Sequence, residues 1–211
     1  SIDPHLFLFL FSDTGGGHRA SSQAVKAELE RLYGRAAVVE MVDVFVEMDR
    51  WPFDRLPDWY PTIVGLNGIP WGVGFHLSDG THMVKAMSKI IWPYTRTPIC
   101  SLLREHPADI IVSFHPVPNY ALFLGLQQLG LRIPVAIVAV DLVTAHAGWF
   151  VPQATVTLVP TQAAKARAVQ CGIDEKHVKV TGMPTRRSFV TAMHLSQAQA
   201  RAQLHQIAPS C

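Results

Sequence analysis

An apolar segment at the start of the chain is followed by a polar, glycine-rich turn and then by an amphipathic segment. The apolar run is His5–Phe11. Because it is short and bounded by a turn, it predicts a strand buried on both faces. Residues 19–33 predict a helix, one face of which carries Ser21, Val25, Leu29 and Leu32. A strand, a glycine-rich turn and a helix form the first unit of a nucleotide-binding sheet.

Strands and helices are predicted to alternate again further along the chain. The predicted strands are residues 36–42, 109–114, 134–140, 154–159 and 177–181, and the predicted helices are residues 81–106, 119–130, 161–172 and 196–205. The helix at 81–106 contains Pro93, which can break it. The alternation predicts an α/β fold with a Rossmann-like, mostly parallel sheet and helices on both faces. It argues against an antiparallel or all-β arrangement.

Residues 45–97 interrupt this alternation. All but one of the five tryptophans lie there, together with many glycines and prolines, and we expect no strand in residues 45–80. Aromatic side chains are favoured where apolar surface meets a wet interface, including membrane headgroups, although they can equally pack over one edge of the sheet. The side chains expected to contact lipid are Trp59, Ile63, Trp71, Phe75 and Trp92. The helix at 81–106 adds cations that suit an anionic membrane surface, at Lys85, Lys89 and Arg96.

The composition excludes several classes of protein. The chain of 211 residues is 49% hydrophobic and 16% charged, so it can bury a large core and still expose apolar surface. Its net charge of +2 is too small to indicate nucleic-acid binding, and no apolar run approaches the roughly 18 residues of a spanning helix. Three widely spaced cysteines without a C-x-x-C motif argue against a disulfide scaffold or a zinc site, and they suit a reducing cytosol.

The glycine-rich turn has the chemistry of a phosphate site. Gly15, Gly16 and Gly17 let a ligand approach the backbone, and they leave unpaired N–H groups at the positive end of a helix. The turn matches neither the dinucleotide fingerprint nor the P-loop. His18, in the first turn of the helix, can take a proton from a substrate hydroxyl. The alternative is that the glycines only make a tight turn and that His18 is a solvated residue.

Polar side chains follow several predicted strands. Asp13 and His18 follow the first strand, His115 follows residues 109–114, and Asp141 and His146 follow residues 134–140. In open parallel sheets the ligand crevice lies outside the carboxyl ends of the strands. We therefore expect these side chains to line one crevice.

Other ionisable positions carry weaker signals. Asp43 ends the second predicted strand and can either meet a ribose or cap the next turn. His76, Asp79 and His82 are spaced by three, but Gly80 breaks the helix between them. We therefore predict no metal site at these three residues.

The segment Ser12-Asp-Thr-Gly-Gly-Gly-His-Arg-Ala-Ser21 resembles the N-terminal signature of the monogalactosyldiacylglycerol synthase and processive diacylglycerol glucosyltransferase family. Three further segments are similar to the family in the same order: His115-Pro116, Val140-Asp-Leu-Val-Thr-Ala-His-Ala-Gly-Trp-Phe150 and Thr181-Gly-Met-Pro184. One departure is Val140-Asp141, where the family pattern leads us to expect Thr-Asp. The resemblance implies one half of a GT-B glycosyltransferase, in which two Rossmann-like domains face each other across a cleft.

The resemblance also implies a reaction and roles for residues. The reaction is inverting transfer of a hexose from a UDP-sugar to diacylglycerol, with the UDP-sugar as co-substrate and no cofactor. His18 is implied as the base for the acceptor hydroxyl, and Gly15, Gly16 and Gly17 as facing the donor diphosphate. The residues implied on the acceptor side are Asp13, His115, Asp141 and His146.

The implied organisation is an acceptor-binding domain at residues 1–185, with the aromatic insertion at 45–97, and the start of a crossover at residues 186–211. The crossover leads to a C-terminal donor domain outside this sequence, which binds most of the UDP-sugar, so we expect residues 1–211 alone to be inactive. The implied partners are diacylglycerol and an anionic membrane surface, with the protein peripheral on the cytoplasmic, inner face of the cell membrane. The donor hexose, galactose or glucose, stays open. So do two alternatives, a free-standing non-catalytic module that binds lipid or phosphate and a sugar-nucleotide epimerase of GT-B fold.

Overall fold

Six parallel strands form one sheet at the centre of the computed structural model, which describes residues 3–13, 16–48, 55, 58, 62, 77–196 and 199. Their order across the sheet is β2-β1-β3-β4-β5-β6, and every neighbouring pair is parallel. The strands are β1 (His5–Phe11), β2 (Ala37–Asp43), β3 (Ile110–Ser113), β4 (Val135–Val138), β5 (Val156–Val159) and β6 (Val178–Val180). The predicted parallel α/β sheet is therefore confirmed.

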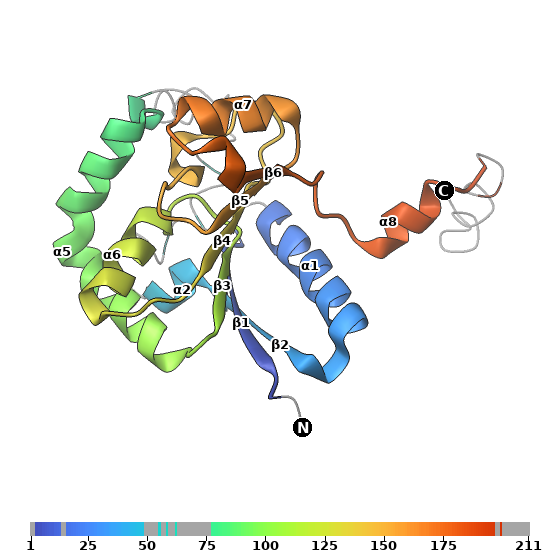
Figure 1. The fold of residues 1–211 in the computed structure, drawn as a ribbon, viewed down its shortest axis with the longest axis horizontal. Helices are drawn as coiled ribbons and strands as arrows, with labels where there is room; N and C mark the ends of the chain where they lie inside the picture. The colour runs from blue at the N-terminus through green and yellow to red at the C-terminus, as the bar shows by residue number, and fades with distance from the viewer. Residues whose placement is uncertain are drawn as a thin grey trace.

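Helices cover both faces of this sheet, as predicted (Figure 1). One face carries α1 (Gly17–Tyr33), and the other carries α2 (Val44–Met48), α5 (Thr81–Glu105) and α6 (Asn119–Leu129). Beside β5 and β6 lies α7 (Gln162–Gln170), and away from the sheet lies α8 (Arg187–Ala192). Three short 3₁₀ turns also lie in the described part of the chain: η1 (Gly34–Ala36), η3 (Ala147–Trp149) and η4 (Glu175–His177).

The side chains of β1 alternate between two hydrophobic cores. Leu8 and Leu10 join the core that packs against α5 and α6, while Phe9 and Phe11 join the core that packs against α1. The start of the strand departs from the predicted burial on both faces, because Leu6 is 38% exposed. The cause is the register, since the first residues of β1 pair with β2 alone and β3 begins further along.

Helix α5 runs without interruption through Pro93 and Pro98, so the sequence-based break at Pro93 is wrong. A proline inside a helix costs about 3 kcal/mol, and close packing against α6 offsets this cost. Ile99 and Leu103 of α5 are buried. A Cβ on Gly125 of α6 would lie only 2.6 Å from Ile99 Cγ2. The glycine therefore lets the two helices approach closely at the point where the prolines weaken α5.

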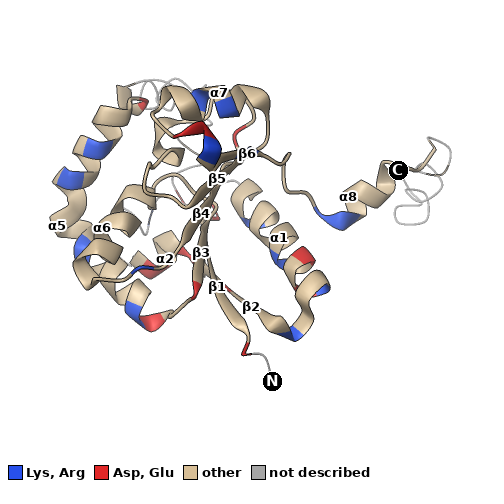
Figure 2. Ribbon diagram, in the orientation of Figure 1, with Lys and Arg blue, Asp and Glu red and all other residues tan. Residues whose placement is uncertain are grey.

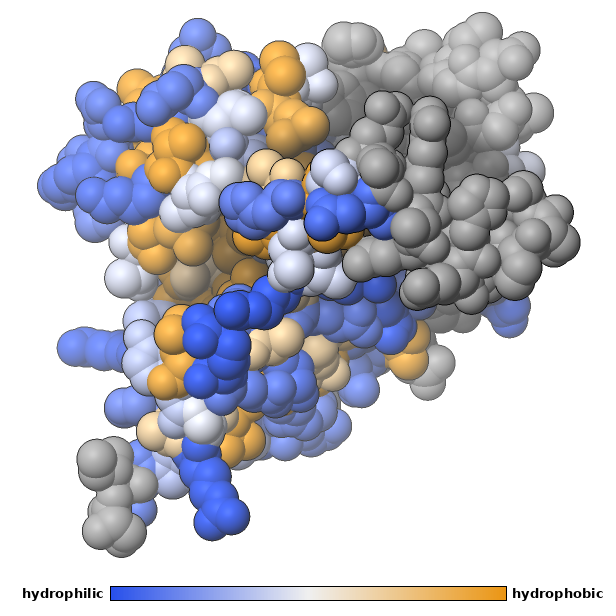
Figure 3. Space-filling model, turned by 90° about the vertical axis from the view of Figure 1, so that its right-hand side faces the viewer, coloured by the Kyte–Doolittle hydropathy of each residue, from blue (hydrophilic) through white to orange (hydrophobic). Residues whose placement is uncertain are grey.

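The described residues after β6 form a helix that the sequence did not predict. None of the side chains of α8 is buried. On the side of the molecule that carries α1 and α8, hydrophobic residues are exposed among hydrophilic ones (Figure 3). The predicted capping box is confirmed, because Ser196 N–H donates to Gln199 Oε1 at 2.8 Å and Gln199 N–H donates to Ser196 Oγ at 3.3 Å. Most of the helix predicted at 196–205 lies outside the described residues, as does most of residues 45–80. No strand occurs in the described positions of 45–80.

Candidate active site

Strands β1, β2 and β3 end together, which brings their following loops to one edge of the sheet. Phe11 of β1 pairs with Asp43 at the end of β2, and the residue before Phe11 pairs with Ser113 at the end of β3. The N–H of Asp13 donates to Asp43 Oδ2 at 2.9 Å. Asp43 Oδ1 accepts from the N–H of Phe45 at 3.0 Å, so Asp43 caps α2. The capping interpretation of this residue is confirmed.

His18 is held beside the end of β3 by the start of α1. The helix follows Gly16, whose φ of 74° lies in the left-handed region that glycine favours. His18 lies in the first turn, and its Nδ1 is 2.7 Å from the carbonyl oxygen of Phe114. Because a carbonyl oxygen only accepts, the proton of the neutral ring is on Nδ1 and Nε2 carries a lone pair. The side chain therefore has the tautomer of a base acting through Nε2.

The rings of His115 and Trp149 lie close to the ring of His18. The ring centroid of His115 lies 4.6 Å from that of His18, and the ring centroid of Trp149 lies 5.9 Å from it. Burial lowers the pKa of His18 below its ordinary value. Burial, and to a smaller extent the neighbouring His18, lower the pKa of His115 well below its ordinary value. Both rings are therefore neutral at pH 7.

Asp141 acts on this group of rings through Trp149 and through its own charge. Its Oδ2 accepts from the indole N–H of Trp149 at 2.7 Å. Burial dominates the pKa of His18, whereas the hydrogen bond to Phe114 and the negative charge of Asp141 raise that pKa in part. Asp141 therefore fixes the Trp149 ring and makes a protonated His18 easier to form.

His146 supports the η3 turn, which carries Trp149. Its Nδ1 accepts from the N–H of Gly148 at 3.0 Å. The proton of the neutral ring is therefore on Nε2, which lies 3.1 Å from Ser78 Oγ. Burial lowers the pKa of His146 more than nearby carboxylates raise it. The neutral form is the one that this turn needs, because a protonated Nδ1 cannot accept a hydrogen bond.

Asp79 connects the start of α5 to the same turn and to α7. Its Oδ1 accepts from the N–H of Ala147 at 2.8 Å and from Arg167 Nη2 at 2.9 Å. The Asp79 side chain is only 20% exposed. Sequence reasoning considered Asp79 only as a metal ligand and missed Arg167, since the two residues are 88 positions apart and share no local pattern.

Asn119 was also missed by sequence reasoning. It is fully buried, it donates to the carbonyl oxygen of Gly148 at 3.1 Å, and its Oδ1 accepts from Ser113 Oγ at 2.6 Å. The side chain thus ties the end of β3 to the η3 turn. The available signal was a polar residue at the predicted start of a helix, a few positions after His115.

The glycine-rich turn leaves open space in front of α1. Gly16 and Gly17 are exposed, and a Cβ on either residue would meet no atom within 4 Å. The N–H groups at this positive end of the helix suit an anion. Asp13 Oδ2 pairs with Arg19 Nη2 at 3.0 Å, so its carboxylate faces a cation on α1. Gly15 lies outside the described residues.

Of the side chains expected to contact lipid, the structure describes Trp92, which is half-buried and packs against the core. The others lie outside the described residues: Trp59, Ile63, Trp71 and Phe75. Among the helices that the structure describes, none combines the length and the hydrophobicity needed to cross a membrane.

One group of described side chains has the composition of a metal site. Glu47, Glu105 and His106 have potential ligand atoms within 4.8 Å of one another. The two glutamates are exposed, and His106 Nδ1 already lies 2.8 Å from Glu40 Oε1. Of the three residues weighed as metal ligands from the sequence, Asp79 is paired with Arg167, His82 is exposed on α5, and His76 lies outside the described residues.

Comparison with known proteins identifies similar sequences. The family model for monogalactosyldiacylglycerol (MGDG) synthase matches residues 18–185. A probable chloroplastic monogalactosyldiacylglycerol synthase of Glycine max is 31% identical over 189 residues, which cover 89% of this chain and 36% of the relative. The chloroplastic monogalactosyldiacylglycerol synthase 2 of Arabidopsis thaliana is 33% identical over 188 residues, which cover 88% of this chain and 40% of the relative. The chain therefore spans well under half the length of these relatives.

Solved structures resemble the chain more distantly. MurG of Acinetobacter baumannii has a TM-score of 0.48 and 13% identity, over 87% of this chain and 46% of that protein. The UDP-GlcNAc 2-epimerase of Neisseria meningitidis, bound to UDP-GlcNAc, has a TM-score of 0.48 and 15% identity, over 98% of this chain and 54% of that protein.

Proposed function

The chain belongs to the monogalactosyldiacylglycerol synthase family, and we propose that it forms the acceptor-binding half of an inverting GT-B glycosyltransferase. In this proposal the enzyme moves a hexose, galactose by the family's name, from a UDP-sugar to diacylglycerol. The donor-binding half lies in the length of the relatives that this chain does not cover. The enzyme acts as a peripheral protein at a membrane surface, on the cytoplasmic side.

His18 is the base of the proposed reaction. The acceptor hydroxyl donates to Nε2, which takes the proton as the hydroxyl oxygen bonds to the anomeric carbon of the sugar. The bond from that carbon to the diphosphate breaks, UDP leaves with the electron pair, and attack from the opposite face inverts the configuration. The imidazolium that forms is stabilised by the hydrogen bond from Nδ1 to Phe114 and by the charge of Asp141.

The N-terminus of α1 is the proposed neighbour of the leaving diphosphate. That group gains negative charge as the sugar is transferred, and the positive end of a helix stabilises such charge. The support is the open space in front of Gly16 and Gly17. The roles of Asp141, His146 and Asn119 are to hold the η3 turn and Trp149 against His18.

The observation that carries this proposal is the orientation of His18. Its Nδ1 lies 2.7 Å from a main-chain carbonyl oxygen, which leaves Nε2 as the nitrogen that can accept a proton. A solvated surface histidine, the alternative from the sequence, is not expected to be half-buried beside His115 and Trp149.

One side of α5 supports the proposed contact with a bilayer. Met83, Met87, Ile90 and Tyr94 recur every three or four residues, so they lie along one side of the helix. All of them are exposed, and Ile90 is 77% exposed. An apolar stripe of this kind can enter the headgroup region without spanning the membrane.

The test is sugar transfer by an enzyme that joins these residues to a donor-binding half, with labelled UDP-galactose and diacylglycerol in vesicles. His18→Ala should lower kcat by about 10²–10⁴-fold, the range for a lost general base, with vesicle binding and circular dichroism unchanged. The matched control is His177→Ala. His177 also has its Nδ1 within 2.9 Å of a main-chain carbonyl oxygen, that of Thr155, but it lies directly before β6.

Two results would overturn the proposal. A near-normal kcat in His18→Ala would show that another residue is the base. A wild-type enzyme that binds diacylglycerol vesicles but transfers no sugar would instead favour a non-catalytic lipid-binding module.

A further inference from the structure

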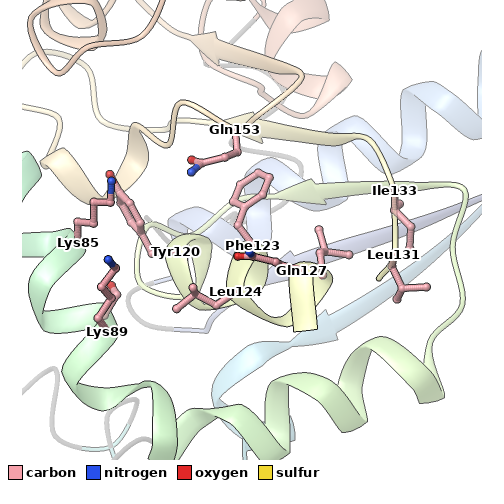
Figure 4. A pocket seen from close by; sticks show the side chains of 11 residues that line it. Lys85, Lys89, Tyr120, Phe123, Leu124, Gln127, Leu131, Ile133 and Gln153 are labelled. Carbon is pink, nitrogen blue, oxygen red and sulfur yellow. The ribbon is translucent and has the colours of Figure 1, made fainter. Parts of the chain in front are cut away.

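A cavity of about 460 Å³ lies between α5 and α6, and it shares no lining residue with the candidate active site (Figure 4). Its walls come from the N-terminal half of α5, from α6, from Leu131 and Ile133 on the loop before β4, and from Gln153 on the loop before β5. The volume falls within the roughly 300–1,000 Å³ typical of small-molecule sites.

The cavity has a polar end and an apolar end. Figure 4 shows Lys85 and Lys89 at one end, Leu131 and Ile133 at the other, and Phe123 and Leu124 between them. A ligand that follows this gradient has a charged group at the α5 end and a hydrocarbon part along α6. A molecule with a charged group at one end and a hydrocarbon part at the other is an amphiphile.

All but one of the polar side chains that line the cavity are available to a ligand; the exception is Tyr120, whose hydroxyl donates to the carbonyl oxygen of Phe150 at 3.3 Å. Within the residues that the structure describes, no hydrogen bond or ion pair is formed by the side chains of Lys85, Ser88, Lys89, Gln127 and Gln153. Ser88 is only 9% exposed. Thr95 on the same helix, by contrast, donates to the carbonyl oxygen of Ile91 at 3.4 Å. Several convergent polar groups in a mainly apolar pocket are typical of a binding site.

The charges at the polar end also favour an anion. Lys85 and Lys89 are four residues apart on α5, a spacing that puts their side chains next to each other, and like charges at this spacing repel. Glu105 is the one acidic residue of α5, and it lies at the far end of the helix (Figure 2). An anion between the two lysines replaces their repulsion with charge-assisted hydrogen bonds.

We propose that this cavity binds a single-chain amphiphile with an anionic headgroup. The headgroup, a carboxylate or a phosphate, lies between Lys85 and Lys89, and the alkyl chain runs past Phe123 towards Ile133. The site goes beyond the proposed sugar transfer, because it involves neither His18 nor a donor-binding half. Its test therefore remains valid whatever the outcome for the transfer reaction.

The experiment is calorimetric titration of residues 1–211 below the critical micelle concentration of each probe. Decanoate and decyl phosphate separate the two headgroups, and decanol and inorganic phosphate separate the chain from the charge. We expect at least one of the two anions, decanoate or decyl phosphate, to bind with one molecule per chain in its own titration. It should bind more tightly than decanol and more tightly than inorganic phosphate. Binding of neither anion, or equally tight binding of decanol or inorganic phosphate, would overturn the proposal.

A pair of double variants locates the binding. Lys85→Gln with Lys89→Gln should weaken affinity about tenfold, the sum expected for two partly exposed ion pairs. Glutamine is a good helix former, so the unfolding temperature should not fall. Lys176→Gln with Lys179→Gln removes the same charge at the β6 edge and should leave affinity unchanged. Equal affinity in the α5 variant and the wild type, or an equal loss in both double variants, would refute the site.

Discussion

Replacement of Asp79 by alanine tests whether the candidate active site is held in place from α5 and α7. Asp79 Oδ1 accepts two hydrogen bonds, from the N–H of Ala147 at 2.8 Å and from Arg167 at 2.9 Å. The alanine variant leaves both donors without this partner. The exposed fractions of the two side chains, 20% for Asp79 and 30% for Arg167, limit how well water can replace it.

The expected loss in the free energy of unfolding is about 2–4 kcal/mol. A hydrogen bond from a backbone N–H to a carboxylate contributes about 1.5–3 kcal/mol. The ion pair adds less, about 0.5–1 kcal/mol, because Arg167 can regain water and solvent screens the pair. Asp79→Asn should be milder, about 1 kcal/mol, because its amide oxygen can still accept from Ala147 while the charge is lost.

The assay is urea unfolding followed by circular dichroism, with Arg167→Ala and the double variant completing a mutant cycle. The matched pair is Lys165 and Glu175, which lie 2.8 Å apart with Glu175 70% exposed, and for which we expect no measurable coupling. A loss below about 0.5 kcal/mol for Asp79→Ala is typical of an unimportant surface position. That result would refute the inference that Asp79 holds the η3 turn.

Three further predictions concern packing, stability towards acid and catalysis. Gly125→Ala should lower the free energy of unfolding by about 1–3 kcal/mol, because its Cβ would lie 2.6 Å from Ile99 Cγ2, whereas Gly17→Ala, which meets no atom within 4 Å, should not. Equal effects of the two variants in urea unfolding would contradict the packing explanation. Burial lowers the pKa values of His18, His115 and His146 below 6.5, so the unfolded chain binds more protons than the folded chain below that pH. The free energy of unfolding should therefore fall as the pH drops from about 6.5 to about 5, before ordinary carboxylates titrate, and a constant value over this range would refute the neutral, buried rings. The negative charge of Asp141 raises the pKa of His18, so Asp141→Asn in an active enzyme should lower that pKa and move the acid limb of the kcat/KM profile to lower pH. An acid limb at unchanged pH would mean that His18 does not control that limb.

Local signals were sufficient to predict the sheet and the pair of histidines. The apolar run His5–Phe11 has the bounds of β1, because a short apolar run between turns has few other structures available to it. The parallel sheet then requires the loops after β1 and β3 to meet at one edge. His18 and His115 do meet there, with ring centroids 4.6 Å apart.

Tertiary contacts decided the features that sequence reasoning missed. Pro93 does not interrupt α5, and further along the same helix the absence of a side chain on Gly125 lets Ile99, next to Pro98, pack closely against α6. Nothing near Pro93 in the sequence reports that contact. The ion pair of Asp79 and Arg167 could not be predicted from the sequence either. The two residues are 88 positions apart, and only the folded chain brings them into contact.

The chemistry of His18 therefore has a local part and a tertiary part. Its position on the first turn of α1 and its free Nε2 follow from the glycine-rich turn and one contact with Phe114. Its lowered pKa follows from burial beside His115 and Trp149, and Trp149 belongs to a turn that Asp79 and Asn119 hold from outside the motif. A chain that keeps the Gly-Gly-His turn but lacks these outside contacts is expected to retain the helix start and to hold His18 in a more exposed, more easily protonated form. The motif is thus a marker of the start of α1 and of the open space in front of it, and the surrounding contacts decide whether its histidine is neutral at pH 7.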